Sequence, residues 1–324
     1  MSSRLSRPMA WAILALVMLA LVACTQLVAP APAPATEAPV EEPGASSFPL
    51  TVTDALSRTV TVASRPQRIV STLPSNTEML FAVGAGDQVV GVTKYCNYPP
   101  EAATRAQVGG ITNKSLSVEA IIALEPDLVL AGAEQDQAID ALSNAGIPVV
   151  ALRLLSFDEV YSAVELVGAL TGHAESGTAL AAAMRSHTES VQAAVGDIAE
   201  SDRPTVFYEV WHEPLMTAGP GTFIGQMIEM AGGRSIFADV SEDWPQVSAE
   251  VVVERDPAVI LGPDSHSDQL TAEAISARPG WSEIAAVKDN RIYLLDGDMV
   301  SRPGPRVVDA LETIARALHP DRFQ

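Results

Sequence analysis

The chain has 324 residues, of which 48% are hydrophobic, and a formal net charge of −20 at pH 7. This length exceeds one ordinary hydrophobic core and suits two domains. So acidic a protein repels nucleic acids and anionic lipid headgroups, which argues against both kinds of partner.

The first 23 residues have the organisation of an export signal. Arg4 and Arg7 form a basic start, and residues 9–23 are almost wholly apolar. Because a membrane-spanning helix needs about 20 apolar residues, the shorter run favours a signal peptide. It ends in "LVAC" at Cys24, which resembles the bacterial lipobox, where the signal is removed before a cysteine that then carries a lipid. We therefore expect a lipidated Cys24 and membrane contact through this anchor only.

Residues 24–48 are rich in proline, alanine and acidic residues. Such sequences favour extended polyproline II conformations and cannot build a core. We predict a tether that joins the anchor to a globular part. With Cys24 lipidated, Cys96 has no intramolecular partner, so no disulfide is expected.

Strand and helix patterns alternate along residues 49–155, the predicted N-terminal lobe. Strands are expected at 68–73, 88–93, 128–132 and 147–152, and helices at 74–84, 118–125 and 138–146. For the first helix we expect a cap at Ser75 or Asn76 and a stop at Gly84. Short strands that are apolar on both faces and alternate with helices are typical of a parallel sheet covered by helices.

The scheme returns in residues 201–324, the predicted C-terminal lobe, with strands at 205–210 and 291–297 and helices at 222–233, 281–290 and 306–318. Residues 156–200 connect the lobes. Gly172 divides this connection, and apolar residues after it keep helical spacing. One helix over 174–199 would be about 39 Å long. The predicted fold is α/β, with two Rossmann-like lobes built on parallel-type sheets, one long connecting helix and a ligand cleft between the lobes.

One stretch occurs twice, as "SLSVEAIIALEPDLVLAG" at 115–132 and "QVSAEVVVERDPAVILG" at 246–262. The copies align without a gap, 131 residues apart. Ser117 and Ser248 are expected to cap equivalent helices, which puts Glu119 and Glu250 at the second helical position. A carboxylate there gains roughly 0.3–1 kcal/mol from the helix dipole. The repeat therefore predicts the same helix–strand unit in each lobe.

Longer motifs resemble the helical-backbone (class III) substrate-binding lipoproteins of ABC transporters, in the group that carries ferric siderophores, haem and cobalamin. They are "RIVSTLPSNTEMLFAVGAGDQVVGVTKYCNYPP", "SVEAIIALEPDLVLAG", "DWPQVSAEVVVERDPAVIL" and "SRPGPRVVDALETIARALHP", in this order over roughly residues 66–320. "TKYCNYPP" and "DWPQVS" are similar to the periplasmic cobalamin-binding proteins. The resemblance implies a ligand cleft between the lobes, small hinge motions, cobalamin as the transported ligand and no cofactor.

The resemblance also implies ligand-binding residues. Tyr95, before the "YPP" turn, and Trp244, in "DWPQVS", would face a corrin ring, and a loop of Asp298, Met299, Val300, Ser301 and Arg302 would close the site. The sequence departs from the cobalamin-binding pattern at two places. The pattern has aromatic residues where this loop has Met299 and Val300, and a tryptophan near 111–112, where this sequence has Ile111 and Thr112. Trp211, at the end of a predicted strand, and His212 are expected to compensate.

The family's docking mode implies that Glu119 and Glu250 contact the dimeric permease, which works with its ATPase subunits. Helix-dipole stabilisation alone is the alternative role for both residues. The protein is expected to be an exported, lipid-anchored monomer that faces the periplasm or the cell exterior and binds no nucleic acid.

Two alternatives for the function stay open. The same fold could bind a ferric siderophore or haem, with Arg302 and Arg306 against anionic groups. A two-domain α/β enzyme is the more distant one, but the sequence has no G-x-S-x-G, no HExxH and no cysteine cluster, so no catalytic activity is expected. The scattered histidines show no zinc spacing, and no metal site is predicted.

Overall fold

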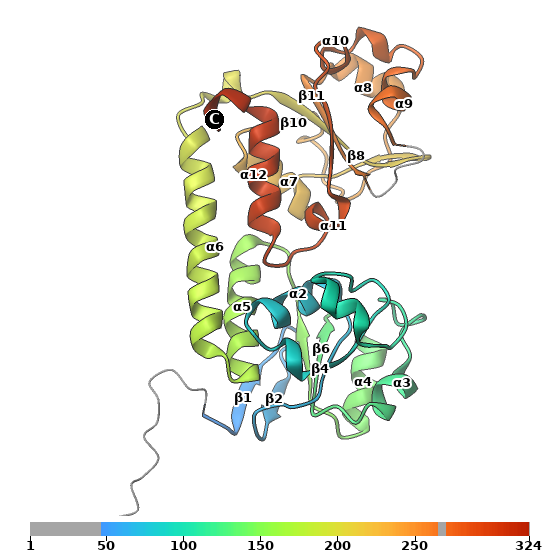
Figure 1. The fold of residues 1–324 in the computed structure, drawn as a ribbon. Coiled ribbons are helices and arrows are strands. Elements are labelled where there is room, and N and C mark those ends of the chain that lie inside the picture. Colours follow the sequence, from blue (N-terminus) through green and yellow to red (C-terminus); the bar gives the residue numbers. More distant parts are fainter. Residues whose placement is uncertain (1–46, 265–269, 324) are drawn as a thin grey trace, which may run out of the picture. The chain divides into compact units, whose positions relative to one another are not determined.

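The computed structural model describes residues 47–264 and 270–323, which carry two parallel sheets in separate stretches of the chain (Figure 1). The predicted signal peptide, Cys24 and nearly all of the tether lie outside the described residues. Both sheets belong to one compact unit. None of the described helices combines the length and apolar character needed to cross a bilayer.

The first sheet has the strand order β5-β4-β3-β6-β7 and is parallel throughout. Its strands are β3 (Ile69–Ser71), β4 (Val89–Val92), β5 (Ala106–Gln107), β6 (Leu128–Gly132) and β7 (Val149–Leu152). The helices of this lobe are α2 (Pro74–Ala82), α3 (Val118–Ala123) and α4 (Asp136–Asn144), with 3₁₀ turns at Gly86–Gln88 and Pro100–Thr104. An antiparallel hairpin of β1 (Leu50–Thr53) and β2 (Thr59–Val62) precedes the sheet.

The second sheet has the parallel order β10-β8-β11-β12, with β9 antiparallel on β8. Its strands are β8 (Thr205–His212), β9 (Leu215–Thr217), β10 (Arg234–Ser235), β11 (Val259–Pro263) and β12 (Ile292–Leu295). The helices are α7 (Phe223–Met230), α8 (Ala249–Arg255), α9 (Ala272–Ser276), α10 (Ala285–Lys288), α11 (Gly297–Val300) and α12 (Val307–Leu318), and 3₁₀ turns lie at Glu200–Asp202, Trp281–Glu283 and Pro320–Arg322. The order β4-β3-β6-β7 in the first sheet matches the order β10-β8-β11-β12 in the second, and β5 extends the first sheet beyond β4. The two lobes thus share one topology, and the predicted fold class is confirmed.

Helices α5 (Phe157–Thr171) and α6 (Ala174–Val195) connect the sheets. Gly172 ends α5 in the left-handed region, at φ 77°. The 22 residues of α6 make a helix of about 33 Å. It runs beside α5 and α12 (Figure 1) and ends four residues before the predicted end. Gly168 and Gly177 let α5 and α6 touch, because a Cβ on Gly168 would lie 2.8 Å from the Gly177 Cα.

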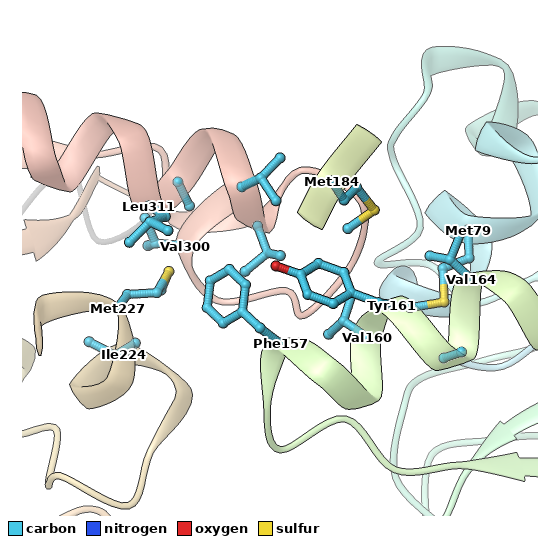
Figure 2. Packing of buried hydrophobic residues seen from close by; sticks show 14 of the residues in the cluster. Met79, Phe157, Val160, Tyr161, Val164, Met184, Ile224, Met227, Val300 and Leu311 are labelled. Atoms are coloured by element: carbon cyan, nitrogen blue, oxygen red, sulfur yellow. The ribbon is translucent and has the colours of Figure 1, made fainter. Parts of the chain in front are cut away.

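A shared core holds this connection to both lobes. Val160 and Val164 of α5, Met184 of α6, and Leu311 of α12 are buried in one cluster (Figure 2). The rings of Phe157 and Phe223 stack in the same cluster at 4.8 Å between centroids. Apolar side chains from the connecting helices and from the C-terminal lobe therefore form one continuous core.

The repeated unit folds as predicted in both copies. Ser117 accepts a hydrogen bond from the Ala120 amide and Ser248 from the Val251 amide, so both serines are N-caps. The strands that follow, β6 and β11, are also 131 residues apart. Glu125 and Asp256, which precede the matched prolines, both adopt left-handed backbone conformations, with φ of 46° and 41°. This shared turn could not be predicted from the residue types, because a residue before proline usually prefers extended backbone.

Two local predictions are wrong. Helix α2 begins after Leu73, which makes no side-chain cap, and Ser75 and Asn76 lie buried within the helix. Pro74 occupies the first helical position, where its missing N–H has no cost. The helix therefore begins before the predicted caps Ser75 and Asn76. The predicted helix at 281–290 is a 3₁₀ turn followed by α10, divided at Ile284, whose backbone is extended.

Candidate functional site

A cavity of about 480 Å³ lies at the carboxyl edge of the second sheet. Open α/β sheets bind ligands at this edge, where the strand order reverses. The cavity is bounded by the ends of β8 and β11, the start of α7, and the chain that follows α11. Leu154 and Leu155, which precede α5, complete its wall. Its lining is Leu154, Leu155, Tyr208, Val210, Gly221, Thr222, Phe223, Ile224, Asp243, Trp244, Pro263, Val300, Ser301 and Pro303.

The lining is mainly apolar. Trp244 is 49% exposed and Leu155 61% exposed, so both offer large hydrophobic surfaces to a ligand. Among the described residues, the lining contains one charged side chain, that of Asp243, and no lysine, arginine or histidine. Such a wall favours a ligand with a broad apolar or aromatic face and no strong negative charge.

Tyr208 is a buried polar residue of the cavity wall. Its side chain is 2% exposed, and its hydroxyl has no hydrogen-bond partner among the described residues. Burial raises the pKa of Tyr208 well above its usual range, so the phenol stays protonated at physiological pH. A buried hydroxyl without a partner is uncommon in folded proteins.

The glycine-rich loop before α7 forms another part of the wall. Thr222 caps α7, because its Oγ1 accepts a hydrogen bond of 3.0 Å from the Gly225 amide. Gly219 allows the loop to pass the chain near Asp243, since a Cβ there would lie 2.0 Å from the Glu242 carbonyl oxygen. This packing brings Asp243 and the start of α7 to the same end of the cavity.

Some of the predicted ligand residues come together and others do not. Trp244, Val300 and Ser301 line the cavity, whereas Tyr95, Trp211 and Met299 are not part of its lining. Tyr95 is 47% exposed, with the Lys94 Nζ 5.0 Å from its ring centroid. The Trp211 Nε1 donates a 2.8 Å hydrogen bond to the Glu213 carbonyl beyond the end of β8. Ligand contact by these residues stays a prediction.

Asp298 and Arg302 take part in a polar contact between the lobes, which we call the interlobe clasp. It also contains Glu78, Asn97, Tyr98 and Arg306. The Arg302 guanidinium donates to Asn97 at 2.6 Å and pairs with Asp298 at 2.6 Å. Asn97 in turn donates to Asp298 at 2.8 Å.

The centre of the clasp is Glu78 of α2, whose side chain is 2% exposed. Arg306 donates to both Glu78 oxygens, at 2.9 and 2.8 Å, and its guanidinium carbon lies 4.0 Å from the centroid of the Tyr98 ring. Arg302 approaches the same carboxylate at 3.5 Å. Sequence reasoning missed Glu78, Tyr208 and Asp243. Glu78 lies in the motif "SNTE", and Arg302 and Arg306 lie in the motif "SRPGPR". Nothing in the sequence indicates that these two motifs are in contact.

The two glutamates of the repeat are exposed on the first turns of α3 and α8. The pKa of the Glu250 carboxyl lies below its usual value, because hydrogen bonds from its own backbone amide and from Ser248 stabilise the charged form. Both side chains are free to meet a partner surface. Contact with a permease stays a prediction.

Within the described residues, no group of three or more His, Cys, Asp and Glu side chains is placed to hold a metal ion. Cys96 is a buried free thiol, 3.1 Å from the Thr93 hydroxyl.

Comparison with known proteins decides the family. The model of the periplasmic binding protein family matches residues 69–299. The chain belongs to the periplasmic binding protein family. Over 284 residues it is 37% identical to the ABC transporter substrate-binding lipoprotein YvrC of Bacillus subtilis, covering 86% of this chain and 88% of that protein. It is 36% identical over 304 residues to a cobalamin-binding protein of Halobacterium salinarum, covering 90% and 81% of the two chains.

Solved structures share the fold of this family member. The vitamin B12-binding protein BtuF of Vibrio cholerae superposes with a TM-score of 0.69 at 26% identity, over 80% of this chain and 99% of that one. The haem-binding protein RhuT of Roseiflexus sp. RS-1 superposes with a TM-score of 0.71 at 27% identity, over 79% and 99%. One fold thus serves relatives with different ligands, and the relative YvrC is a substrate-binding lipoprotein of an ABC transporter.

Proposed function

We propose that this periplasmic binding protein captures cobalamin or a related corrinoid in the cleft between its lobes and delivers it to an ABC permease. The observation that carries the proposal is the lining of the cavity, which presents Trp244 and apolar side chains with no cation among the described residues. A corrin ring is wide, flat and fringed with neutral amides, so it matches this surface. The similarity to cobalamin-binding relatives supports the same ligand.

The size of the cavity indicates how a corrinoid would bind. A hollow of about 480 Å³ accepts one edge of such a ligand rather than the whole molecule. The ring would then extend over Trp244 toward the mouth of the cleft. Exposed Tyr95, although it is outside the cavity lining, would be available to the outer part of the ligand.

A ferric siderophore or haem fits less well. Recognition of carboxylates by arginine requires free guanidinium groups. Arg306 is engaged by both oxygens of Glu78, and Arg302 is paired with Asp298 and Asn97. The arginines that the sequence offered for an anionic ligand are therefore held in the interlobe clasp.

Isothermal titration with cyanocobalamin tests the ligand. The purified protein without its lipid should release or absorb heat on binding at micromolar concentration and should shift the visible absorption bands of the corrin. Haemin and a ferric hydroxamate siderophore serve as comparison ligands. Absence of both heat and band shift with cyanocobalamin, together with tight binding of either comparison ligand, would reject cobalamin as the ligand.

Two further parts of the proposal concern location and delivery. Cys24 is proposed to carry the lipid anchor on the outer side of the membrane, and Glu119 and Glu250 are proposed to contact equivalent sites on the two permease subunits. Pseudo-equivalent lobes suit a two-fold partner. Labelling of cells with a radioactive fatty acid tests the anchor: the label should enter the wild-type protein and be lost in Cys24→Ser.

A further inference from the structure

Leu155 is the most exposed of the large apolar residues that line the cavity. It is 61% exposed, against 49% for Trp244, whereas the neighbouring Leu154 packs partly on the core. Leu155 immediately precedes Ser156, the cap of α5. An apolar residue at this position commonly packs on the fourth residue of the helix. That residue, Val160, is fully buried, yet most of the Leu155 surface stays exposed.

Side chains from two helices fix the backbone of Leu155. Its N–H donates to the Glu159 Oε2 at 2.6 Å, and its C=O accepts from the Gln226 Nε2 at 2.9 Å. Glu159 lies on the first turn of α5, and Gln226 lies on α7 of the C-terminal lobe. Both backbone polar groups of this exposed leucine are therefore held in place by residues of the protein.

The start of α5 departs from an ordinary capping box in a way that holds Leu155. Ser156 and Glu159 have the spacing of such a box, in which the glutamate side chain bonds the amide of the cap residue itself. Ser156 does cap α5, because it accepts a 3.3 Å hydrogen bond from the Glu159 amide. The Glu159 carboxylate, however, bonds the amide of Leu155, one residue earlier. The glutamate thus orders the residue that lines the cavity.

A ring stack joins the same two helices beside this hydrogen bond. The rings of Phe157 and Phe223 lie 4.8 Å apart between centroids, and Figure 2 shows Phe157 beside α7. Phe223 lines the cavity together with Leu155. Two parts of the wall, the residues before α5 and the start of α7, are therefore attached to each other. Because these contacts belong to the protein itself, this part of the cavity needs no ligand to assemble it.

We propose that Leu155 is a preorganised contact for an apolar part of the ligand, and that Gln226 and Glu159 are positioning residues that hold it. A ligand that covers Leu155 buries apolar surface, which favours binding. Since the backbone is fixed beforehand, little conformational entropy is lost when the ligand binds. The proposal rests on the proposed function, because a corrin ring carries methyl groups among its amides. It adds which residue receives such a group and which residues set its position.

Titration with cyanocobalamin and the apparent Tm without added ligand test Leu155. Leu155→Ala should weaken cyanocobalamin binding about tenfold, because the ligand then covers less apolar surface. Its Tm should stay close to that of the wild type, because an exposed side chain contributes little to folding. Ile122→Ala is the matched control: this isoleucine is 41% exposed on α3, outside the cavity lining, and its removal should leave the affinity unchanged.

A double-mutant cycle tests Gln226. Gln226→Met keeps the length of the side chain but removes the donor to Leu155, and it should weaken cyanocobalamin binding about threefold. In a Leu155→Ala background the same substitution should change the affinity less than about 1.5-fold, because Gln226 acts through Leu155. Gln192→Met, which changes an exposed glutamine on α6, is the control and should have no effect. Additive effects of the Gln226 and Leu155 substitutions would overturn the positioning role.

Two variants of Glu159 test the other hydrogen bond. Glu159→Ala removes the acceptor of the Leu155 amide and should weaken cyanocobalamin binding about threefold. Glu159→Gln keeps an oxygen that can accept this bond and should restore most of the affinity. Equal affinities of the two variants would show that Glu159 does not position the leucine.

The outcomes separate the leucine contact from the ligand assignment. If the wild type binds cyanocobalamin but Leu155→Ala binds it equally well, the contact is wrong and the cobalamin assignment survives. If the wild type binds haemin and not cyanocobalamin, the ligand assignment fails, and the same variants are titrated with haemin. A loss of about tenfold in Leu155→Ala then supports the contact, and an unchanged affinity overturns it. If the wild type binds neither ligand, both proposals fail.

Discussion

Glu78 and Arg306 join the two lobes through a bidentate ion pair, in which Arg306 donates to both carboxylate oxygens at 2.9 and 2.8 Å. The carboxylate is almost wholly buried, and the arginine side chain is 16% exposed. Hydrogen bonds from the arginine to Glu78 raise the pKa of Arg306, so its guanidinium remains charged. The pair fixes the start of α12 against α2, and with it the chain that lines the cavity near Val300 and Ser301.

Removal of the Glu78 charge should therefore destabilise the protein strongly. Glu78→Gln removes the bidentate counter-charge of Arg306 in a buried contact, whereas Arg302 keeps its pair with Asp298. We expect a loss of about 3–5 kcal/mol in the free energy of unfolding. Urea denaturation measures this loss. Glu283→Gln is the control, because it breaks an exposed pair with Lys288 and should cost less than about 1 kcal/mol. Equal, small effects of the two substitutions would show that the clasp does not stabilise the fold.

We predict that Trp244 contributes more to ligand binding than Tyr95. Trp244 lines the cavity, whereas Tyr95 is exposed outside it. Trp244→Ala should weaken cyanocobalamin binding by roughly 10–100-fold, in the range of an aromatic hot spot, and Tyr95→Ala by less. Titration of both variants gives the comparison. A larger loss in Tyr95→Ala would place the main contact outside the cavity, in a more closed arrangement of the lobes.

The sequence predicted the parts of the fold that depend on local patterns. The repeat at 115–132 and 246–262 correctly predicted both serine caps. The alternation of strands and helices correctly predicted two parallel sheets. The sequence could not predict the interlobe clasp, because Glu78 and Arg306 are 228 residues apart and their pairing depends on how α5, α6 and α12 pack. Long-range packing also decides the roles within residues 298–302, which the resemblance treated as one ligand loop. Val300 and Ser301 line the cavity, whereas Asp298 and Arg302 belong to the interlobe clasp.

Buried polar residues on strands are a second limit of sequence analysis. Tyr208 lies in the strand "TVFYEV". In the sequence it looks like one more large, mainly apolar residue of a buried strand. Whether its hydroxyl finds a partner depends on the side chains that the fold brings next to it, which the local sequence does not reveal. Asp243 directly precedes Trp244, which the resemblance implied as a ligand residue. This neighbouring position in the sequence could have identified Asp243 as part of the site.

Asp54 should make stability depend on pH in the acid range. Burial alone would raise its pKa, but hydrogen bonds from Arg58 and from the amides of Ala151 and Leu56 outweigh burial and hold the pKa below the usual value of 3.8. A carboxyl with a depressed folded pKa stabilises the protein above its unfolded pKa, and this stabilisation is lost as the pH falls through the folded pKa. Asp54→Asn should therefore lower stability at pH 7 and reduce the loss of stability below pH 4.

Urea midpoints between pH 7 and pH 2.5 measure this effect. Asp158→Asn is a suitable control, because its side chain is 87% exposed beside Arg185 and should leave the pH profile nearly unchanged. An Asp54→Asn profile parallel to that of the wild type over the whole range would contradict the role given to Asp54.

The paired glutamates of the repeat give the sharpest test of delivery. Glu119 and Glu250 occupy the same exposed position in two helices with the same serine cap, so the two lobes present one charge each in equivalent settings. If each pairs with an arginine of one permease subunit, the double variant Glu119→Ala/Glu250→Ala should lose docking and transport while cyanocobalamin affinity stays unchanged. Each single variant should lose part of the docking.

Binding to permease reconstituted in nanodiscs measures docking, and titration in parallel measures ligand affinity. Glu254→Ala on α8 is the matched control, since it removes a carboxylate from the same helix outside its first turn. The double variant should also bind with less dependence on salt than the wild type, because screening weakens exposed charge pairs. Normal docking and transport by the double variant would leave helix-dipole stabilisation as the role of both glutamates.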